Sequence, residues 1–149
     1  YIKNMQLAQF NIARIRYPLD DPRMKEFVDN IDLIHRVADR VKGLVHRVKA
    51  EGQTDSTSTV VFGDPTIVPN LTIWDSVQSL KDFVFKTMHK RFFDNRDKWF
   101  IDNLTLPKNV MWYVPDGYIP TMQEGESRLL RLAAIGNSEY AFDWKYLSK

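Results

Sequence analysis

The side chains that could transfer a proton at neutral pH are the three histidines. His89 lies in FVFKTMHKRFF, a segment that is apolar almost all round, where a neutral imidazole could be a general base, an axial metal ligand or a structural hydrogen-bonding group. His46 alternates with Leu44 and Val48 in a strand-like run, so we expect it to be at least partly buried, in a core, an interface or a pocket. His35 lies beside the apolar stripe of a predicted helix, where a solvated ring is expected. His89 and His46 are therefore the candidate acid–base residues.

Amide side chains among apolar neighbours form a second candidate set. Asn70 and Trp74 are four residues apart on one predicted strand, so they share a face with Thr72 between them. Gln9 and Asn11 repeat this pattern on the first predicted strand. A buried amide without a partner costs about 1–3 kcal/mol. These side chains are therefore expected either to bond to loop backbone or to orient a ligand in a pocket.

Other kinds of site have little support. The chain has no glycine-rich phosphate loop, no HExxH or similar ligand spacing and no GxSxG elbow, so we expect no metal site. It has no cysteine, which excludes disulfides and thiolate chemistry. The basic residues between 86 and 98 are interrupted by Asp94 and Asp97, which is typical of a solvated helix face. With a net charge of only +2, no nucleic-acid partner is expected.

Composition indicates a single globular domain. The 149 residues are 44 % hydrophobic and 27 % charged, and no stretch approaches the roughly 18 apolar residues of a membrane helix. We therefore expect no membrane partner. Without a leader pattern or cysteine, a cytoplasmic location is expected. The domain is predicted to span residues 5–149, with residues 1–4 as an extension.

Periodicity and capping signals predict the elements that must position these residues. Strands are expected at 5–13, 44–50, 67–74 and 109–114. Helices are expected at 21–42, from Asp75 to about 101, and from Thr121 to about 135, each beginning at a capping residue. The aromatic tail around 140–146 is expected to form an extended arm after the last helix.

The predicted order is βαββαβ, which is typical of a ferredoxin-like α+β fold, a four-stranded antiparallel sheet with helices on one face. The strand at 109–114, NVMWYV, is apolar on both faces. Two helices can cover only one face of such a sheet, and a large apolar face is rarely left in water. We therefore expect a homodimer in which two sheets pack face to face.

Three long segments resemble a known group of proteins: MQLAQFNIARIRYPLDDPRMKEFVDNID, NLTIWDSVQSLKDFVFKTMHKRFFDNRDKWF and MWYVPDGYIPTMQEGESRLLRLAAIGNSEYAFDW. Within them, WDSVQSLKDF and VPDGYIPT are the most distinctive runs. On these residues the chain resembles a widespread family of uncharacterised proteins that is similar to the antibiotic-biosynthesis monooxygenase-like domains. The resemblance covers nearly the whole chain from Met5 and implies a dimeric α+β barrel.

The resemblance also implies site residues. Cofactor-independent quinone-forming relatives have an Asn and a Trp four residues apart on one strand, which Asn70 and Trp74 match. Haem-degrading relatives have a first-strand Asn, a third-strand Trp and a His on the second long helix, roles that Asn11, Trp74 and His89 could fill. Two positions depart from the pattern: Tyr118 stands where a GHxPT-like segment has His, and His46 stands where relatives often have an aromatic residue.

The leading hypothesis is a small enzyme that acts on a hydrophobic, aromatic or polyketide-like molecule in a pocket between sheet and helices. Asn11 and Asn70 would hold a carbonyl or a developing oxyanion, and His89 or His46 would move a proton. The reaction would be a monooxygenase-like oxidation of the kind used in secondary metabolism, or an acid–base cyclisation or isomerisation. Trp74 lines this pocket and is a catalytic candidate with Asn70. The remaining substrate contacts are assigned to Gln9, Thr72, Phe92, Trp112, Tyr113 and Tyr118.

Two alternatives stay open at this point. One is a haem-binding or haem-degrading protein with His89 as axial ligand; outside this alternative no cofactor is expected. The other is a non-catalytic small-molecule-binding or assembly protein on the same scaffold.

Overall fold

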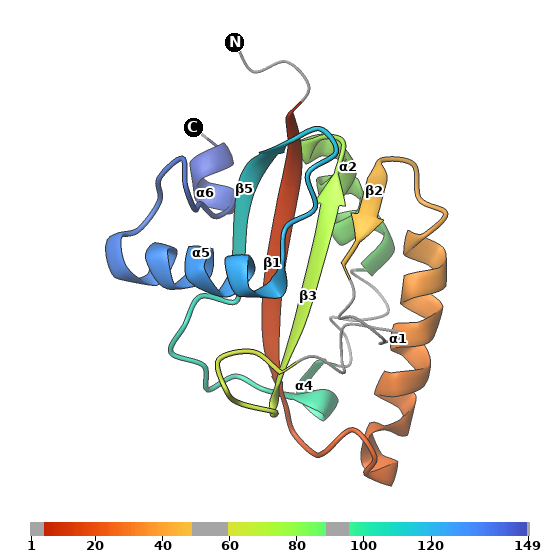
Figure 1. The fold of residues 1–149 in the computed structure, drawn as a ribbon. Helices are drawn as coiled ribbons and strands as arrows, with labels where there is room; N and C mark the ends of the chain where they lie inside the picture. Colours follow the sequence, from red (N-terminus) through yellow and green to blue (C-terminus); the bar gives the residue numbers. More distant parts are fainter. Residues whose placement is uncertain (1–4, 49–59, 89–95, 149) are drawn as a thin grey trace.

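The fold is a mixed α+β arrangement around a five-stranded antiparallel sheet (Figure 1). The computed structural model describes residues 5–48, 60–88 and 96–148. The strands are β1 (Met5–Ile15), β2 (Leu44–Arg47), β3 (Ile67–Trp74), β4 (Phe100–Ile101) and β5 (Asn109–Pro115). The order is β2-β3-β1, and both β5 and β4 lie along the other edge of β1.

β1 is the central strand, and its length explains why two strands share one edge. β5 pairs with β1 from Met5 to Asn11, which leaves the end of β1 free. The two residues of β4 pair there with Arg14 and Ile15. The predicted second long helix was expected to include Phe100 and Ile101. That prediction is wrong, because these residues satisfy the backbone groups of β1 that β5 does not reach.

The first helical segment begins where the sequence predicts. The Asp21 carboxylate accepts a hydrogen bond of 2.9 Å from the Arg23 backbone N–H and caps η1 (Pro22–Met24), a 3₁₀ turn that leads into α1 (Lys25–Ala38). Hydrogen bonds from the Arg23 side chain and backbone lower the pKa of Asp21 from 3.8 to about 2. The helix ends at Ala38, four residues earlier than expected.

The second helical segment differs most from the prediction. The cap is Ser76, whose hydroxyl accepts from the Ser79 N–H, and not Asp75, whose own N–H still bonds to the Gly43 carbonyl. α2 (Val77–Asp82) then widens into η3 (Phe83–Met88), a π-helix. Residues 89–95 lie outside the described part, and α4 (Arg96–Trp99) precedes β4.

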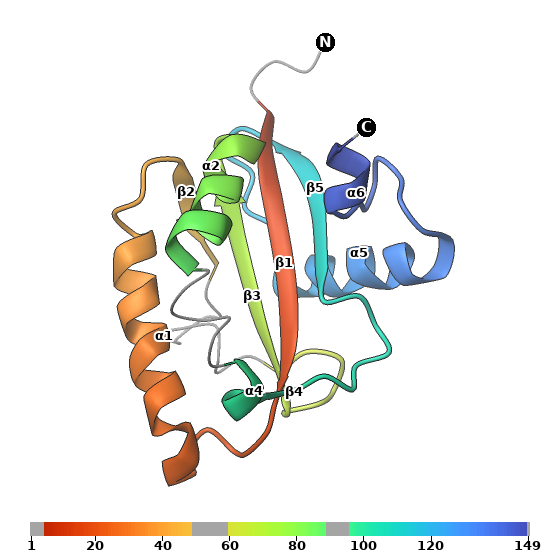
Figure 2. The ribbon, with the colours of Figure 1, turned by 180° about the vertical axis from the view of Figure 1, so that it is seen from behind.

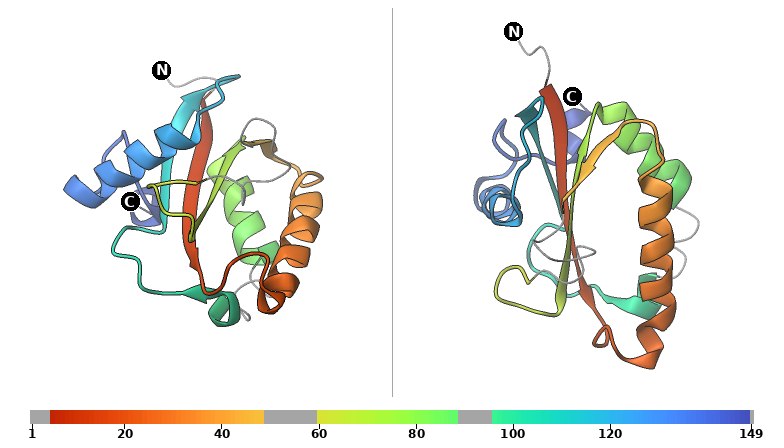
Figure 3. Two further views of the ribbon diagram at one scale, coloured as in Figure 1. Left: turned by 60° about the horizontal axis from the view of Figure 1, so that its bottom comes forward. Right: turned by 45° about the vertical axis from the view of Figure 1, so that its right-hand side comes forward.

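The C-terminal segments cover the face of the sheet that was expected to need a second chain. α5 (Met122–Ile135) is capped by Thr121, as predicted. Leu129 and Leu132 of α5 pack on Phe10, Val110 and Trp112, which are all buried. Figure 3 shows α1 and α2 on one side of the sheet and α5 on the other. The expectation of helices on one face only is therefore wrong, and the sequence argument for a face-to-face dimer loses its premise.

The aromatic tail is not a fully extended arm. Phe142 forms a bridge with Met111 of β5, and the chain then turns into α6 (Trp144–Leu147), capped by Asp143. The side chains of this tail pack beside α2 and η3, where the ring centroids of Phe85 of η3 and Trp144 lie 5.9 Å apart. No helix within the described ranges is long and apolar enough to cross a membrane.

Candidate functional site

A cavity of about 630 Å³ lies between α1, α2 and the sheet. Figure 2 shows α1 beside the sheet and α2 in front of it, and residues of both helices line the cavity. Helix residues supply a largely apolar wall: Phe27, Ile31, His35 and Ala38 from α1, and Leu80, Phe83 and Val84 from α2 and η3. Trp144 of α6 completes it. The volume is within the usual range for small-molecule sites.

The floor of the cavity is polar because the strand register aligns amides. Asn11 of β1 stands directly opposite Asn70 of β3 and Asn109 of β5. Residues that are paired in this way point to the same face, so three asparagines form one row across three strands. Thr72 and Gln9 form the next row, since they are also paired with each other.

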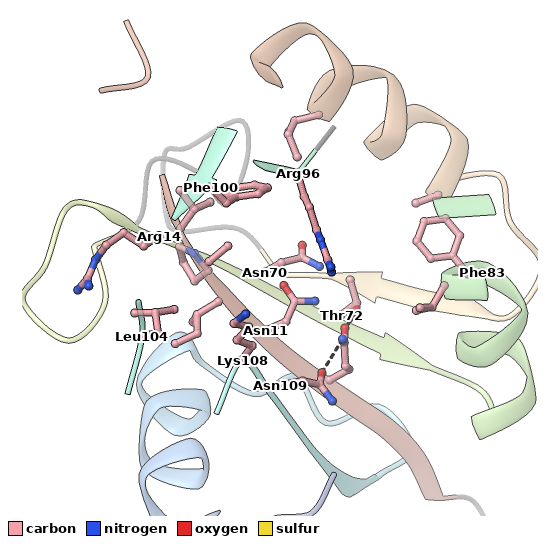
Figure 4. A pocket seen from close by; sticks show the side chains of 18 of the residues that line it. Asn11, Arg14, Asn70, Thr72, Phe83, Arg96, Phe100, Leu104, Lys108 and Asn109 are labelled. Atoms are coloured by element: carbon pink, nitrogen blue, oxygen red, sulfur yellow. Dashed lines mark hydrogen bonds between the residues drawn. The ribbon is translucent and has the colours of Figure 1, made fainter. Parts of the chain in front are cut away.

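A chain of hydrogen bonds joins these rows, and its direction is determined by its first member. The indole Nε1–H of Trp74 can only donate, and it lies 2.8 Å from Thr72 Oγ1. The Thr72 hydroxyl therefore donates to Gln9 Oε1, at 3.2 Å. Gln9 Nε2 then donates to Asn109 Oδ1, at 2.7 Å (Figure 4).

The last amide of this chain has a spare donor. Because Asn109 Oδ1 accepts from Gln9, its Nδ2 is the free end, and this nitrogen is buried with no hydrogen-bond partner among the described residues. Buried donors in folded proteins are rarely left unpaired. Asn109 lines the cavity, so this amide is a group of its floor with a donor to spare.

Arg47 provides a second set of spare donors at the edge of the cavity. It is paired with Thr72, so it projects toward the same face, and its side chain is only 7 % exposed. Its Nη2 lies 3.2 Å from the carboxylate of Asp39, just beyond the end of α1. Its Nε and Nη1 are buried and have no hydrogen-bond partner within the described ranges.

Several other charged side chains around the cavity have partners. Arg14 bonds to Asp64 at 2.9 Å, and Lys108 forms an ion pair with Asp102. The hydrogen bond and charge of Lys108, with a further contribution from Arg96, lower the pKa of Asp102. Figure 4 shows the Arg96 side chain extending from α4 toward the sheet, in the direction of Asn70.

The structure brings together part of the predicted site. The amides Gln9, Asn11 and Asn70 line the cavity, together with Thr72 and Trp74. His89 and Phe92 lie outside the described residues.

Three predicted contacts are placed elsewhere. Trp112 alternates with Met111 and so lies on the opposite face, under α5. Tyr113 shares the cavity side of the sheet, but it lies beyond Met111 and packs on Phe142, with ring centroids 5.5 Å apart. Tyr118 follows the strand, and its hydroxyl donates to Glu124 at 2.7 Å.

His46 was expected to be at least partly buried, and that expectation is wrong. A register shift between Leu44 and His46 places Leu44 opposite Trp74 but His46 opposite Ile73. The imidazole is therefore on the α5 side of an edge strand, where it is exposed. The same shift turns Arg47 toward the cavity.

Asn109, Arg47 and His35 are among the cavity residues that sequence reasoning did not assign to the site. Asn109 precedes the apolar run of β5 and looked like a strand start. Arg47 was overlooked beside His46, because the bulge has no glycine or proline to indicate it. His35 was expected to be solvated, but it lines the cavity. A polar residue directly before an apolar strand is the one signal that could have identified Asn109.

Comparisons with known proteins give a family and no activity. A family model described as a domain of unknown function (DUF3291) matches residues 6–149. No curated protein matches the sequence. Among solved structures, the chain is similar to a protein of unknown function from Nitrosomonas europaea at 10 % identity, with a TM-score of 0.47. That match covers 79 % of this chain and 95 % of the other.

Proposed function

Since this chain belongs to the DUF3291 family of unknown function, we propose a function from its cavity: it binds a largely apolar small molecule that carries a hydrogen-bond acceptor. The observation that carries this proposal is the polar floor, which ends in the unpartnered Asn109 Nδ2 beneath largely apolar walls. Apolar walls supply most of the binding free energy, while a few fixed polar groups orient the ligand.

Calorimetric titration with 2-acetylnaphthalene, a neutral aromatic ketone, tests this proposal. We expect saturable binding with a negative heat-capacity change, because apolar surface is buried. Ala13→Phe places a ring on the cavity floor and should weaken binding at least tenfold, about 1.4 kcal/mol.

The matched control is Ala133→Phe, the same substitution at an exposed position of α5, which should bind the ketone like the unaltered chain. Absence of saturable binding, or equal binding by Ala13→Phe, contradicts the proposal.

An enzyme that acts on this ligand is the second candidate, and it is favoured by the position of His35. This imidazole lines the same cavity as Asn11 and Asn70. It could remove a proton from the carbon next to a bound carbonyl and return it, while the amides stabilise the negative oxygen of the enolate.

Proton NMR in D₂O gives a direct measurement of this chemistry. The protein should accelerate exchange of the methyl protons of 2-acetylnaphthalene for deuterium. His35→Gln should bind the ketone but lose the acceleration, whereas His46→Gln, on the exposed side of β2, should retain it. Exchange that proceeds equally in His35→Gln excludes this role.

We also propose that the chain resembles the antibiotic-biosynthesis monooxygenase-like proteins. This part of the proposal includes their ferredoxin-like dimeric barrel and an oxidation of the bound ligand. The strand order β2-β3-β1-β5 supports the ferredoxin-like arrangement, and Asn70 and Trp74 both line the cavity.

The haem alternative depends on His89, outside the described residues. It predicts a Soret band with haemin that His89→Ala abolishes.

A further inference from the structure

We propose that the ligand is an organic anion and that Arg47 holds its carboxylate; this inference rests on the proposed binding function. Arg47 is the lining residue with the largest unmet hydrogen-bonding capacity among those that the structure describes. Two of its guanidinium nitrogens have no partner, and the third bonds to Asp39 at 3.2 Å.

Burial makes this arrangement costly without a second anion. The Arg47 side chain is 7 % exposed, whereas Asp39 is 52 % exposed, so solvent weakens the single ion pair while the guanidinium is largely removed from water. Buried charges in proteins are normally paired and fully hydrogen-bonded. A carboxylate bound beside Arg47 would accept from Nη1 and from the second N–H of Nη2 together, the two-pronged geometry that arginine favours.

The charges around the cavity agree with an anionic ligand. The lining residues that the structure describes include four cations, Arg14, Arg47, Arg96 and Lys108, and two carboxylates, Asp97 and Asp102. Arg14 and Lys108 are engaged by Asp64 and Asp102. The Arg96 side chain extends into the cavity, toward the asparagine row (Figure 4). Arg47 keeps two buried nitrogens without a partner among the described residues, so a ligand anion would meet its positive charge there.

The rest of the cavity indicates what the carboxylate is attached to. Phe27, Ile31, Phe83 and Trp74 offer apolar and aromatic surface, and the free Asn109 Nδ2 offers a donor on the floor. The ligand class is therefore an aromatic or aliphatic acid. Inorganic anions would lack the apolar contacts.

A pair of probes that differ only in charge tests the inference. We expect calorimetry at pH 7 to show 2-naphthoate binding at least tenfold more tightly than 2-naphthamide, its neutral isostere. Arg47→Met keeps a long apolar side chain and should bring the ratio of the two affinities to about one; this ratio is the readout because the carbonyl of 2-naphthamide can also accept from Arg47. Equal binding of both probes by the unaltered chain, or a preference that survives in Arg47→Met, overturns the inference.

Asp39→Asn makes the test independent of whether Arg47→Met folds. If Arg47 receives a ligand carboxylate, loss of its competing partner Asp39 should tighten 2-naphthoate binding severalfold without affecting 2-naphthamide. If Arg47 only ties β2 to α1, Asp39→Asn will leave the ratio of the two affinities unchanged, and the inference fails. Binding of 2-naphthamide alone would uphold the proposed function and reject the anion, whereas binding of neither probe would reject both.

Discussion

Thr72 is the residue on which the order of the cavity floor depends. Its hydroxyl accepts from Trp74 Nε1 and donates to Gln9, so it determines the orientation of the Gln9 amide and, through it, that of Asn109. Trp74 and Thr72 lie on β3, Gln9 lies on β1 and Asn109 lies on β5. A single hydroxyl thus coordinates the hydrogen bonding of β3, β1 and β5.

Thr72→Val keeps the shape of this side chain and removes its hydroxyl. The buried Trp74 N–H then loses its acceptor, and we expect the free energy of unfolding to fall by about 1–3 kcal/mol. Urea unfolding measures the change. Thr105→Val, at an exposed position, should stay within about 0.5 kcal/mol of the unaltered chain. A neutral Thr72→Val would mean that the hydrogen-bond chain contributes nothing to stability.

At the scale of elements, α5 is held close to the sheet by a glycine. Gly125 lies within the helix and is buried, and a Cβ built there would lie 2.5 Å from Cδ1 of Phe10, which is itself fully buried. Glycine inside a helix costs about 1 kcal/mol relative to alanine. Its presence here is explained by the close approach of helix and strand.

Gly125→Ala should therefore lower the free energy of unfolding, although alanine has the higher helix propensity. We expect a loss of about 1–2 kcal/mol in thermal or urea unfolding, because overpacking of the core outweighs the gain in propensity. In a Phe10→Leu background, which provides space, the same substitution should become neutral or stabilising. If Gly125→Ala is stabilising in the unaltered chain, α5 lies farther from β1 than described.

At the scale of the whole molecule, α5 covers the second face of the sheet, so a single chain buries this face without a partner. Leu129 is fully buried against this face, while the next residue, Leu130, is 48 % exposed. The homodimer remains a prediction for sedimentation analysis. Face-to-face packing of two sheets would require α5 to leave the position that it occupies here.

Leu129→Asp and Leu130→Asp separate folding from association. Leu129→Asp should destabilise the chain by more than about 4 kcal/mol, since it places an unpaired charge in the core. Leu130→Asp should change stability by less than about 0.5 kcal/mol. Circular dichroism on heating and sedimentation velocity distinguish the outcomes. A Leu129→Asp chain that stays folded but becomes monomeric would show that this face packs against another copy.

The sequence by itself determined the local features of this protein. Alternation and capping residues predicted β3 residue for residue and the caps at Asp21 and Thr121, because these depend on neighbours within a few positions. They also identified the amides of β1 and β3 as one group, since side chains alternate with a period of two along a strand. The cap at Ser76 and the short β4 were missed, because Asp75 is held outside the helix by its bond to Gly43 and β4 by its pairing with β1, both far along the chain.

Only the tertiary structure decided which side chains meet. The bulge in β2 turns Arg47 toward the cavity and His46 away from it. A shift of one residue in register moves every following side chain to the opposite face of the sheet. The alignment of Asn109 with Asn11 likewise exists only after β5 has paired with β1. The cover provided by α5 depends on a contact between Gly125 and Phe10, which are more than a hundred positions apart. The sequence supplied the polar groups of the site, and strand register selected which of them share one cavity.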